Sequence, residues 1–168
     1  MNVCEVVRDI RINNEQTQLQ FGFDYDVTRE TISKIENGHQ KIPADISNKL
    51  MKKFDDPRLA MAIRREYTHT GPVWLDGPNV DLHPASVKEK TIEEAHEAIE
   101  AARSISFSKP LHLINPTILE NAAIQIAQNI IAWEHLLAVM CKHGNISYQG
   151  VWYKTDSQLE KAGYIMGV

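Results

Sequence analysis

The sequence predicts an all-α protein, and three observations lead to this prediction. Apolar residues recur at helical spacing along most of the chain. Prolines and capping residues stand where helices would begin, and glycines stand where they would end. The 168 residues are 43% apolar and 24% charged, which is typical of a globular chain long enough for two small domains. We expect five helices in residues 1 to 67, a connector in residues 68 to 85, and a helical C-terminal domain in residues 86 to 168.

The first two helices differ in how clearly they are signalled. Residues 3 to 13 carry apolar side chains at helical spacing and predict a packing helix. Thr17 then caps a second helix. Apolar residues alternate along this second segment, a pattern that would also suit a strand: Leu19, Phe21, Phe23 and Tyr25.

The third helix has a short apolar stripe and a polar face. Asp26 suits the tight turn before it, because aspartate tolerates the left-handed conformation, and Thr28 is a natural N-cap. Ile32 and Ile35 face inward together, three residues apart. Gly38 ends the helix. The opposite face carries four polar side chains: Arg29, Glu30, Ser33 and Lys34.

Two more helices complete the N-terminal domain, and a connector follows them. Apolar residues at i, i+4 and i+8 predict the fourth helix, after Pro43: Ile46, Leu50 and Phe54. Asp56-Pro57 begins the fifth. In residues 68 to 85, two short apolar runs flank the turn signal Asp76-Gly77-Pro78-Asn79. This connector is either a structured linker or a short β-hairpin.

Three helices are expected in the C-terminal domain. Ser86, with Glu89 three residues later, predicts the cap of the first. Its inward residues would be Val87, Ile92, Ala95, Ile99 and Ala102. Asn115-Pro116 begins the longest helix, which extends to about Cys141. A final helix spans residues 147 to 163, and Gly150 is expected to interrupt it.

The longest helix carries a heptad seam, spaced 4-3-4-3-4-3. Its residues are Leu119, Ala123, Ile126, Ile130, Trp133, Leu137 and Met140. Either the 86–104 helix covers this seam as part of a core, or a second subunit does. The spacing favours a core position for Trp133. Because the 86–104 helix is shorter than the seam helix, we expect the seam to take part in a homodimer.

The helix-turn-helix segment resembles a known family. The run Thr-Arg-Glu-Thr-Ile-Ser-Lys-Ile-Glu-Asn-Gly at residues 28 to 38 is similar to the recognition helix of the XRE regulators, typified by the lambda and 434 repressors and Cro. Thr17-Gln18-Leu19 matches the start of the first motif helix. The resemblance covers residues 3 to 67 and implies a five-helix lambda-repressor-like domain, with a helix after Thr17. Gly22 stands where the family usually has alanine.

The resemblance also implies a DNA site. Residues at the family's base-reading positions are Thr28, Arg29, Glu30 and Lys34. Residues at positions that hold the DNA backbone are Arg11, Gln18, Asn37 and Lys41. Arginine and lysine suit guanine O6 and N7, and glutamate accepts from cytosine N4. We therefore expect a prophage-type transcription regulator or repressor that binds double-stranded DNA as a homodimer.

The charge balance leaves a second function open. Residues 1 to 67 hold eleven Lys and Arg against eleven Asp and Glu, so the domain has no net basic charge. DNA-binding domains usually carry a basic surplus. The alternative is a protein-interaction module on the same scaffold, of the antitoxin or antirepressor-partner type, with a protein partner for the C-terminal domain.

Other function classes lack support in the sequence. Cys4 and Cys141 have no metal or disulfide spacing, so a reducing, cytoplasmic location is expected. The start of the chain shows no signal peptide, and residues 118 to 141 contain too many polar residues to span a membrane. Glu93-x-x-His96 has di-iron spacing but no second copy. We expect no metal, no cofactor and no catalytic site.

Overall fold

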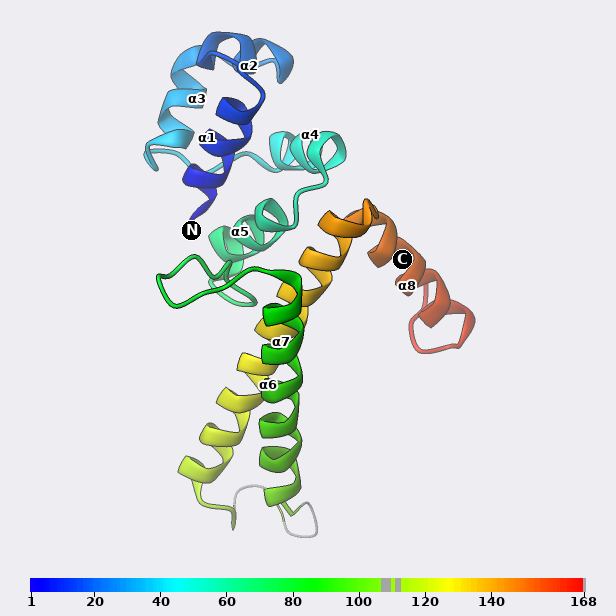
Figure 1. The fold of residues 1–168 in the computed structure, drawn as a ribbon. Helices are drawn as coiled ribbons and strands as arrows, with labels where there is room; N and C mark the ends of the chain where they lie inside the picture. Colours follow the sequence, from blue (N-terminus) through cyan, green and yellow to red (C-terminus); the bar gives the residue numbers. More distant parts are fainter. Residues whose placement is uncertain (107–109, 111–112, 168) are drawn as a thin grey trace. The chain divides into compact units, whose positions relative to one another are not determined.

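A computed structural model describes residues 1–106, 110 and 113–167, which form eight α-helices and no strand (Figure 1). The all-α prediction is therefore confirmed. In chain order the helices are α1 (Val3–Asn13), α2 (Gln18–Asp24), α3 (Arg29–Glu36), α4 (Ala44–Phe54), α5 (Pro57–Thr68), α6 (Pro84–Ser104), α7 (Pro116–Gly144) and α8 (Tyr148–Lys161). None of these helices is both long and apolar enough to cross a membrane.

The chain divides into two compact units. One comprises Met1–Asp76 together with Ile146–Val168, and the other comprises Gly77–Asn145. In this division α8, which the sequence places in the C-terminal domain, is grouped with α1 to α5.

The core of the first unit lies between its N-terminal helices. The apolar spacing expected for these helices is found, because the residues at those spacings are almost completely buried. The largest fully buried side chains here are Val6, Val7, Phe21, Ile32, Ile35, Ile42, Ile46, Leu50 and Leu59. Burying one large apolar side chain contributes roughly 1.5–3 kcal/mol. This core holds the motif helices α2 and α3 in place.

The alternating apolar residues of α2 divide between two faces of a helix. Phe21 and Tyr25, one turn apart, are buried, and their ring centroids lie 4.9 Å apart. Leu19 and Phe23, also one turn apart, are exposed. A capping box at Thr17 starts the helix, with the Thr17 side chain accepting from the backbone of Gln20. The strand alternative is therefore wrong for this segment.

The connector contains no hairpin. Residues 69 to 83 form neither helix nor strand, and a turn in which the Val80 N–H donates to the Gly77 carbonyl stands at the expected hairpin position. Proline lacks a backbone donor, so Pro72 removes a ladder donor next to the first apolar run, and Pro78 removes a donor from the turn between the two runs. Asp76 instead forms an ion pair with the N-terminal amine of Met1, at 2.9 Å. Of the two alternatives, the linker is correct.

Helix α6 begins before its predicted start. His83 is the cap, its Nδ1 accepting from the Ala85 N–H at 3.3 Å, and Pro84 follows in the first turn. Ser86, the predicted cap, lies inside the helix and donates its hydroxyl to Asp81 at 2.6 Å. Pro84 was the better signal, because proline is favoured at the first helical position.

The second unit is built around a helical hairpin. α6 and α7 run side by side in opposite directions (Figure 1). α7 begins at the predicted Asn115 cap and extends to Gly144, slightly beyond the predicted end. The Thr91 hydroxyl on α6 lies 3.1 Å from the Ala132 carbonyl on α7, which sets the two helices in register.

The predicted seam of α7 does not face α6. Five of its residues are exposed, and two are half-buried, Leu119 and Leu137. The exposed ones are Ala123, Ile126, Ile130, Trp133 and Met140. A second stripe on α7 consists of the residues directly before each seam position. This earlier stripe faces α6, since it includes the Ala132 carbonyl that contacts Thr91 and the buried Ala122 and Val139. Within one chain the core expectation for Trp133 is wrong, as are the inward positions expected for Ile92, Ile99 and Ala102.

Helix α8 follows its predicted limits closely. Ser147 caps it by accepting from the Gly150 N–H at 2.9 Å, and the helix continues through Gly150 without a break. The interruption expected at Gly150 is therefore absent, because this glycine lies within the first turn. The Gln149 N–H donates to the Asp55 carboxylate at 2.8 Å.

Candidate nucleic-acid interface

Helices α2 and α3 meet through a turn that a single glycine makes possible. Gly22 is buried, and a Cβ added there would lie 2.7 Å from the Val27 carbonyl oxygen. The Val27 N–H donates back to the Gly22 carbonyl at 2.9 Å. Asp26 takes the left-handed conformation in this turn, with φ of 57°. The close backbone approach sets the direction in which α3 leaves the turn.

The start of α3 is capped as the sequence predicts. The Thr28 side chain accepts from the Thr31 N–H at 3.2 Å. The pKa of Glu30 is lowered by a hydrogen bond from its own backbone N–H, by the Thr28 hydroxyl, and by the charges of Arg29 and Lys34. Glu30 is therefore ionised at neutral pH, in the first turn, where a negative charge is favoured by the helix dipole.

All four residues expected to contact bases are exposed, Thr28 as the N-cap of α3 and the other three on the helix itself. Ile32 and Ile35 are buried on the inner side. Thr28, Arg29, Glu30 and Lys34 are all exposed. The structure thus brings the four together on one short helix and its N-cap, accessible from solvent.

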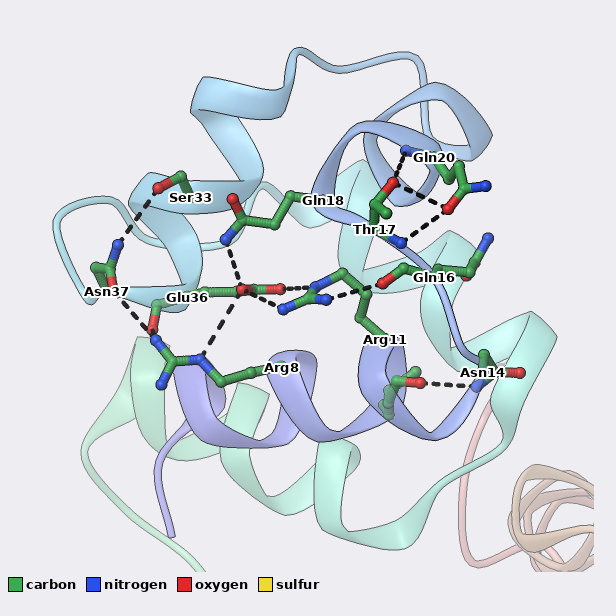
Figure 2. A network of polar contacts seen from close by, with 11 residues as sticks. Arg8, Arg11, Asn14, Gln16, Thr17, Gln18, Gln20, Ser33, Glu36 and Asn37 are labelled. Atoms are coloured by element: carbon green, nitrogen blue, oxygen red, sulfur yellow. Dashed lines mark hydrogen bonds and ion pairs between the residues drawn. The ribbon is translucent and has the colours of Figure 1, made fainter.

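Behind this surface, a network of polar contacts is centred on Glu36 (Figure 2). Glu36 is almost completely buried, and Arg11 binds its carboxylate at two points, Nε to Oε1 at 2.5 Å and Nη2 to Oε2 at 3.0 Å. The Gln18 amide donates to Oε2 at 2.8 Å. Arg8 donates to the Glu36 carbonyl at 3.2 Å and to the Asn37 side chain at 3.1 Å. Side chains from α1 and α2 therefore hold the end of α3.

The network keeps Glu36 charged. Burial pushes its pKa upward, but hydrogen bonds from Arg11 and Gln18 and the charges of Arg11 and Arg8 outweigh this effect, so the pKa lies below its usual value. A buried carboxylate with these partners is ionised at neutral pH.

Sequence reasoning missed Glu36 and Arg8. Glu36 stands four residues after Ile32 and one after Ile35, at the spacing of the inward face. An acidic residue at an inward position needs a buried partner, and this signal was present in the sequence.

The four residues expected at the DNA backbone lie in two places. Arg11, Gln18 and Asn37 belong to the Glu36 network, and the Arg11 side chain is only 14% exposed. Lys41 lies elsewhere, donating to the Glu66 carbonyl at 3.1 Å with its ammonium over the Tyr67 ring. Arg11 and Gln18 thus have a structural role, and their contact with phosphate stays a prediction.

Acidic residues near α3 are paired with lysines of α4. Asp24 lies 3.1 Å from Lys53, and Asp26 lies 3.0 Å from Lys49. Hydrogen bonds from Gln16 and Lys53 lower the pKa of Asp24. In contrast, Arg29 and Lys34 form no ion pair within 4 Å in the part of the chain that the structure describes. The N-terminal domain therefore has no net charge, but two cations on α3, Arg29 and Lys34, are not neutralised by an ion pair among the described residues.

Comparisons with protein-family models, curated proteins and solved structures found no match to this chain.

Proposed function

We propose that this chain is a sequence-specific, DNA-binding transcription regulator of the XRE type, which inserts α3 into the major groove and acts as a homodimer. The observation that carries this proposal is the exposed set of Arg29, Glu30 and Lys34 on one side of a short helix, supported from behind by the buried Glu36 network. A rigidly held polar helix is what groove recognition requires.

Each exposed residue suits a defined DNA contact. The Arg29 guanidinium and the Lys34 ammonium would donate to guanine O6 and N7, and the Glu30 carboxylate would accept from cytosine N4. Thr28 stands at the helix N-terminus, where a phosphate is favoured. Asn37, Lys41, Gln18 and Arg11 would lie at or behind the phosphates and set the register without reading sequence.

The proposed homodimer determines the spacing of the two DNA contacts. Two copies of α3 would contact half-sites about one helical turn of DNA apart, roughly 34 Å. A single domain with no net charge has weak non-specific attraction to DNA. Doubling the number of base contacts compensates for that weakness.

Fluorescence anisotropy tests the proposal directly. The intact chain is titrated against a DNA pool from its own genome over a salt series, beside Arg29→Ala, Lys34→Ala and the control Lys52→Ala, which removes an exposed lysine of α4. Each α3 substitution should cost about 1–3 kcal/mol of binding free energy and change site preference, whereas Lys52→Ala should change little. No binding by the intact chain at low salt would reject the proposal.

A second function is favoured by one observation. Leu19 and Phe23 project from α2 one turn apart, with Phe23 84% exposed, so the motif also carries an apolar pair that suits a protein partner. The alternative is a protein-interaction module of the antitoxin or antirepressor-partner type. It predicts that Phe23→Ser abolishes partner capture and that DNA binding is absent in the anisotropy experiment.

A further inference from the structure

The contact between α6 and α7 is made largely by small and polar side chains. The buried side chains of the hairpin include Thr91 and Ala98 on α6 and Ala122 and Val139 on α7. The Thr91 hydroxyl lies within hydrogen-bond distance of two carbonyls, those of Val87 at 2.7 Å and Ala132 at 3.1 Å. Buried oxygens of Glu94, Gln125 and Asn129 have no hydrogen-bond partner. This contact sets the register of the helices and includes polar groups as well as small apolar ones.

Several large apolar side chains of the hairpin are exposed. We call five of them the hairpin face: Ile92 and Ile99 on α6, and Ile126, Ile130 and Trp133 on α7. Their exposed fractions range from 39% for Ile92 and Ile126 to 52% for Ile130. Exposed apolar groups of this size in one cluster usually mark an interaction surface.

Helix geometry places all five on the same side of the hairpin. Each follows directly after a residue of the contact stripe: Ile92 after Thr91, Ile99 after Ala98, Ile126 after Gln125, Ile130 after Asn129 and Trp133 after Ala132. A residue lies about 100° around the helix from the one before it, in the same sense for every α-helix. In an antiparallel pair of helices, the residues that directly follow the contact residues of one helix and those that follow the contact residues of the other therefore lie on the same side of the pair. The hairpin face is therefore continuous across α6 and α7.

The two sides of the hairpin differ in charge. The five members of the hairpin face are apolar, and Lys88, which follows the buried Val87, stands beyond Ile92 on the same side of α6. The other flank carries Lys90 and Glu97 of α6, together with the uncharged Gln128 and Ile124 of α7. A partner for the hairpin face therefore needs an uncharged, apolar surface. An identical copy of the face meets this requirement.

The length of the seam points to the same partner. From Leu119 to Met140 it extends over about 32 Å at 1.5 Å per residue. Among the described helices only α6 and α7 exceed 14 residues, and α6 already occupies the neighbouring stripe of α7. The five side chains would bury roughly 900 Å² between two copies, and Leu137 and Met140 would add to this, close to the area that a specific interface needs.

We propose that a second copy of this chain docks on the hairpin face, so that two α6–α7 hairpins form a four-helix bundle. Pairing two hairpins gives each a second packed layer, which a lone two-helix hairpin lacks. The inference rests on the proposed function for its homodimer and names the surface that forms it. Ile130 lies at the middle of the seam, and so closest to its own counterpart across a two-fold axis.

Sedimentation velocity of the full chain, without DNA, tests this proposal. At micromolar concentration the intact chain should have twice the 19.1 kDa chain mass. Ile130→Lys places a charge in the hairpin face and should give the single-chain mass at the same concentration. The matched control Gln128→Lys places the same charge on the other flank of α7 and should leave the dimer intact. A single-chain mass for the intact protein, or a dimer that Ile130→Lys leaves unchanged, would overturn the proposal.

If circular dichroism shows that Ile130→Lys lowers helicity, its single-chain mass could reflect misfolding, and a cross-linking measurement then tests the hairpin face instead. In a Cys4→Ser, Cys141→Ala background, Ile130→Cys should be joined to its counterpart by a short bismaleimide, and Gln128→Cys should not. Absence of the Ile130→Cys cross-link would reject the hairpin face. Because both readouts are independent of DNA, a chain that dimerises this way but fails to bind DNA would refute the proposed function and leave this inference standing.

Discussion

Arg11 of α1 and Glu36 of α3 form a two-point ion pair in the interior of the N-terminal unit, with Nε–Oε1 and Nη2–Oε2 separations of 2.5 and 3.0 Å. Arg11 also donates to the Gln16 carbonyl at 2.8 Å, in the loop between α1 and α2. One guanidinium therefore links three consecutive segments of the motif. Because the Glu36 side chain is 1% exposed and that of Arg11 14%, the loss of either partner leaves a poorly solvated charge without its main counter-charge.

Glu36→Ala should lower the free energy of unfolding by about 3–5 kcal/mol, since the Arg11 charge would remain buried without its partner. The double variant Arg11→Met with Glu36→Leu removes both charges and should lower the free energy of unfolding by less than Glu36→Ala alone. Urea denaturation followed by circular dichroism measures these differences. Glu97→Ala, an exposed acid on α6, is the control and should change stability by less than about 0.5 kcal/mol. Equal losses for Glu36→Ala and Glu97→Ala would show that the network adds nothing to stability.

The same carboxylate should make stability depend on acid pH. The pKa of Glu36 is lower in the folded chain than in the unfolded chain, so the unfolded chain takes up the proton first as the pH falls. The contribution of Glu36 to the free energy of unfolding is complete above the ordinary glutamate pKa of about 4.3. It is lost as the pH falls through the lower pKa of Glu36 in the folded chain. The urea midpoint, measured from neutral pH to pH near 3, should fall more steeply for the natural chain than for Glu36→Gln. Parallel pH profiles would contradict this assignment.

Gly22→Ala should destabilise the motif although alanine favours helices. The added Cβ would lie 2.7 Å from the Val27 carbonyl oxygen, which is backbone and has little room to move. The gain in helix propensity is about 1 kcal/mol, and overpacking of this kind costs typically 1–3 kcal/mol, so we expect a net loss. Gly77→Ala is the control, because a Cβ there meets no atom within 4 Å. Thermal unfolding compares the two, and a more stable Gly22→Ala chain would mean that the turn shifts to accept the methyl group.

Much of the fold follows from local signals in the sequence. Thr17, Thr28 and Asn115 cap the helices that they were expected to cap, because a side-chain oxygen at those positions satisfies free N–H groups wherever the helix packs, and the predicted start of the last helix is found at Ser147. The predicted cap at Ser86 was wrong because a stronger start signal, Pro84, stood two residues earlier. Caps and turns depend on a few neighbouring residues, which is why they are predictable.

The rotation of α7 was not predictable from spacing alone. The predicted seam is apolar at every position, whereas the stripe one residue earlier, about 100° around the helix, includes the polar Gln125 and Asn129, so spacing favours the wrong stripe. Pairing with α6 was decided by the small residues Ala122 and Ala98 and by the Thr91 hydroxyl, since these allow the two backbones to approach. The buried polar position of Glu36 likewise depends on Arg11, which is 25 residues away.

Asp26→Asn should strengthen DNA binding if α3 contacts DNA as proposed. Asp26 precedes α3 by three residues, its side chain is 86% exposed, and it is paired with Lys49 at 3.0 Å. Asparagine also accepts the left-handed conformation found here, and an exposed ion pair contributes little to stability, so the fold should be kept. Removing this charge leaves Lys49 free to attract phosphate, and affinity at low salt should rise by a factor of about 2–10, with a smaller gain at high salt. Glu97→Gln makes the same change in net charge on α6 and should have little effect. Anisotropy titrations of both variants over a salt series measure the difference, and equal affinities would show that the charge next to α3 has no special influence on binding.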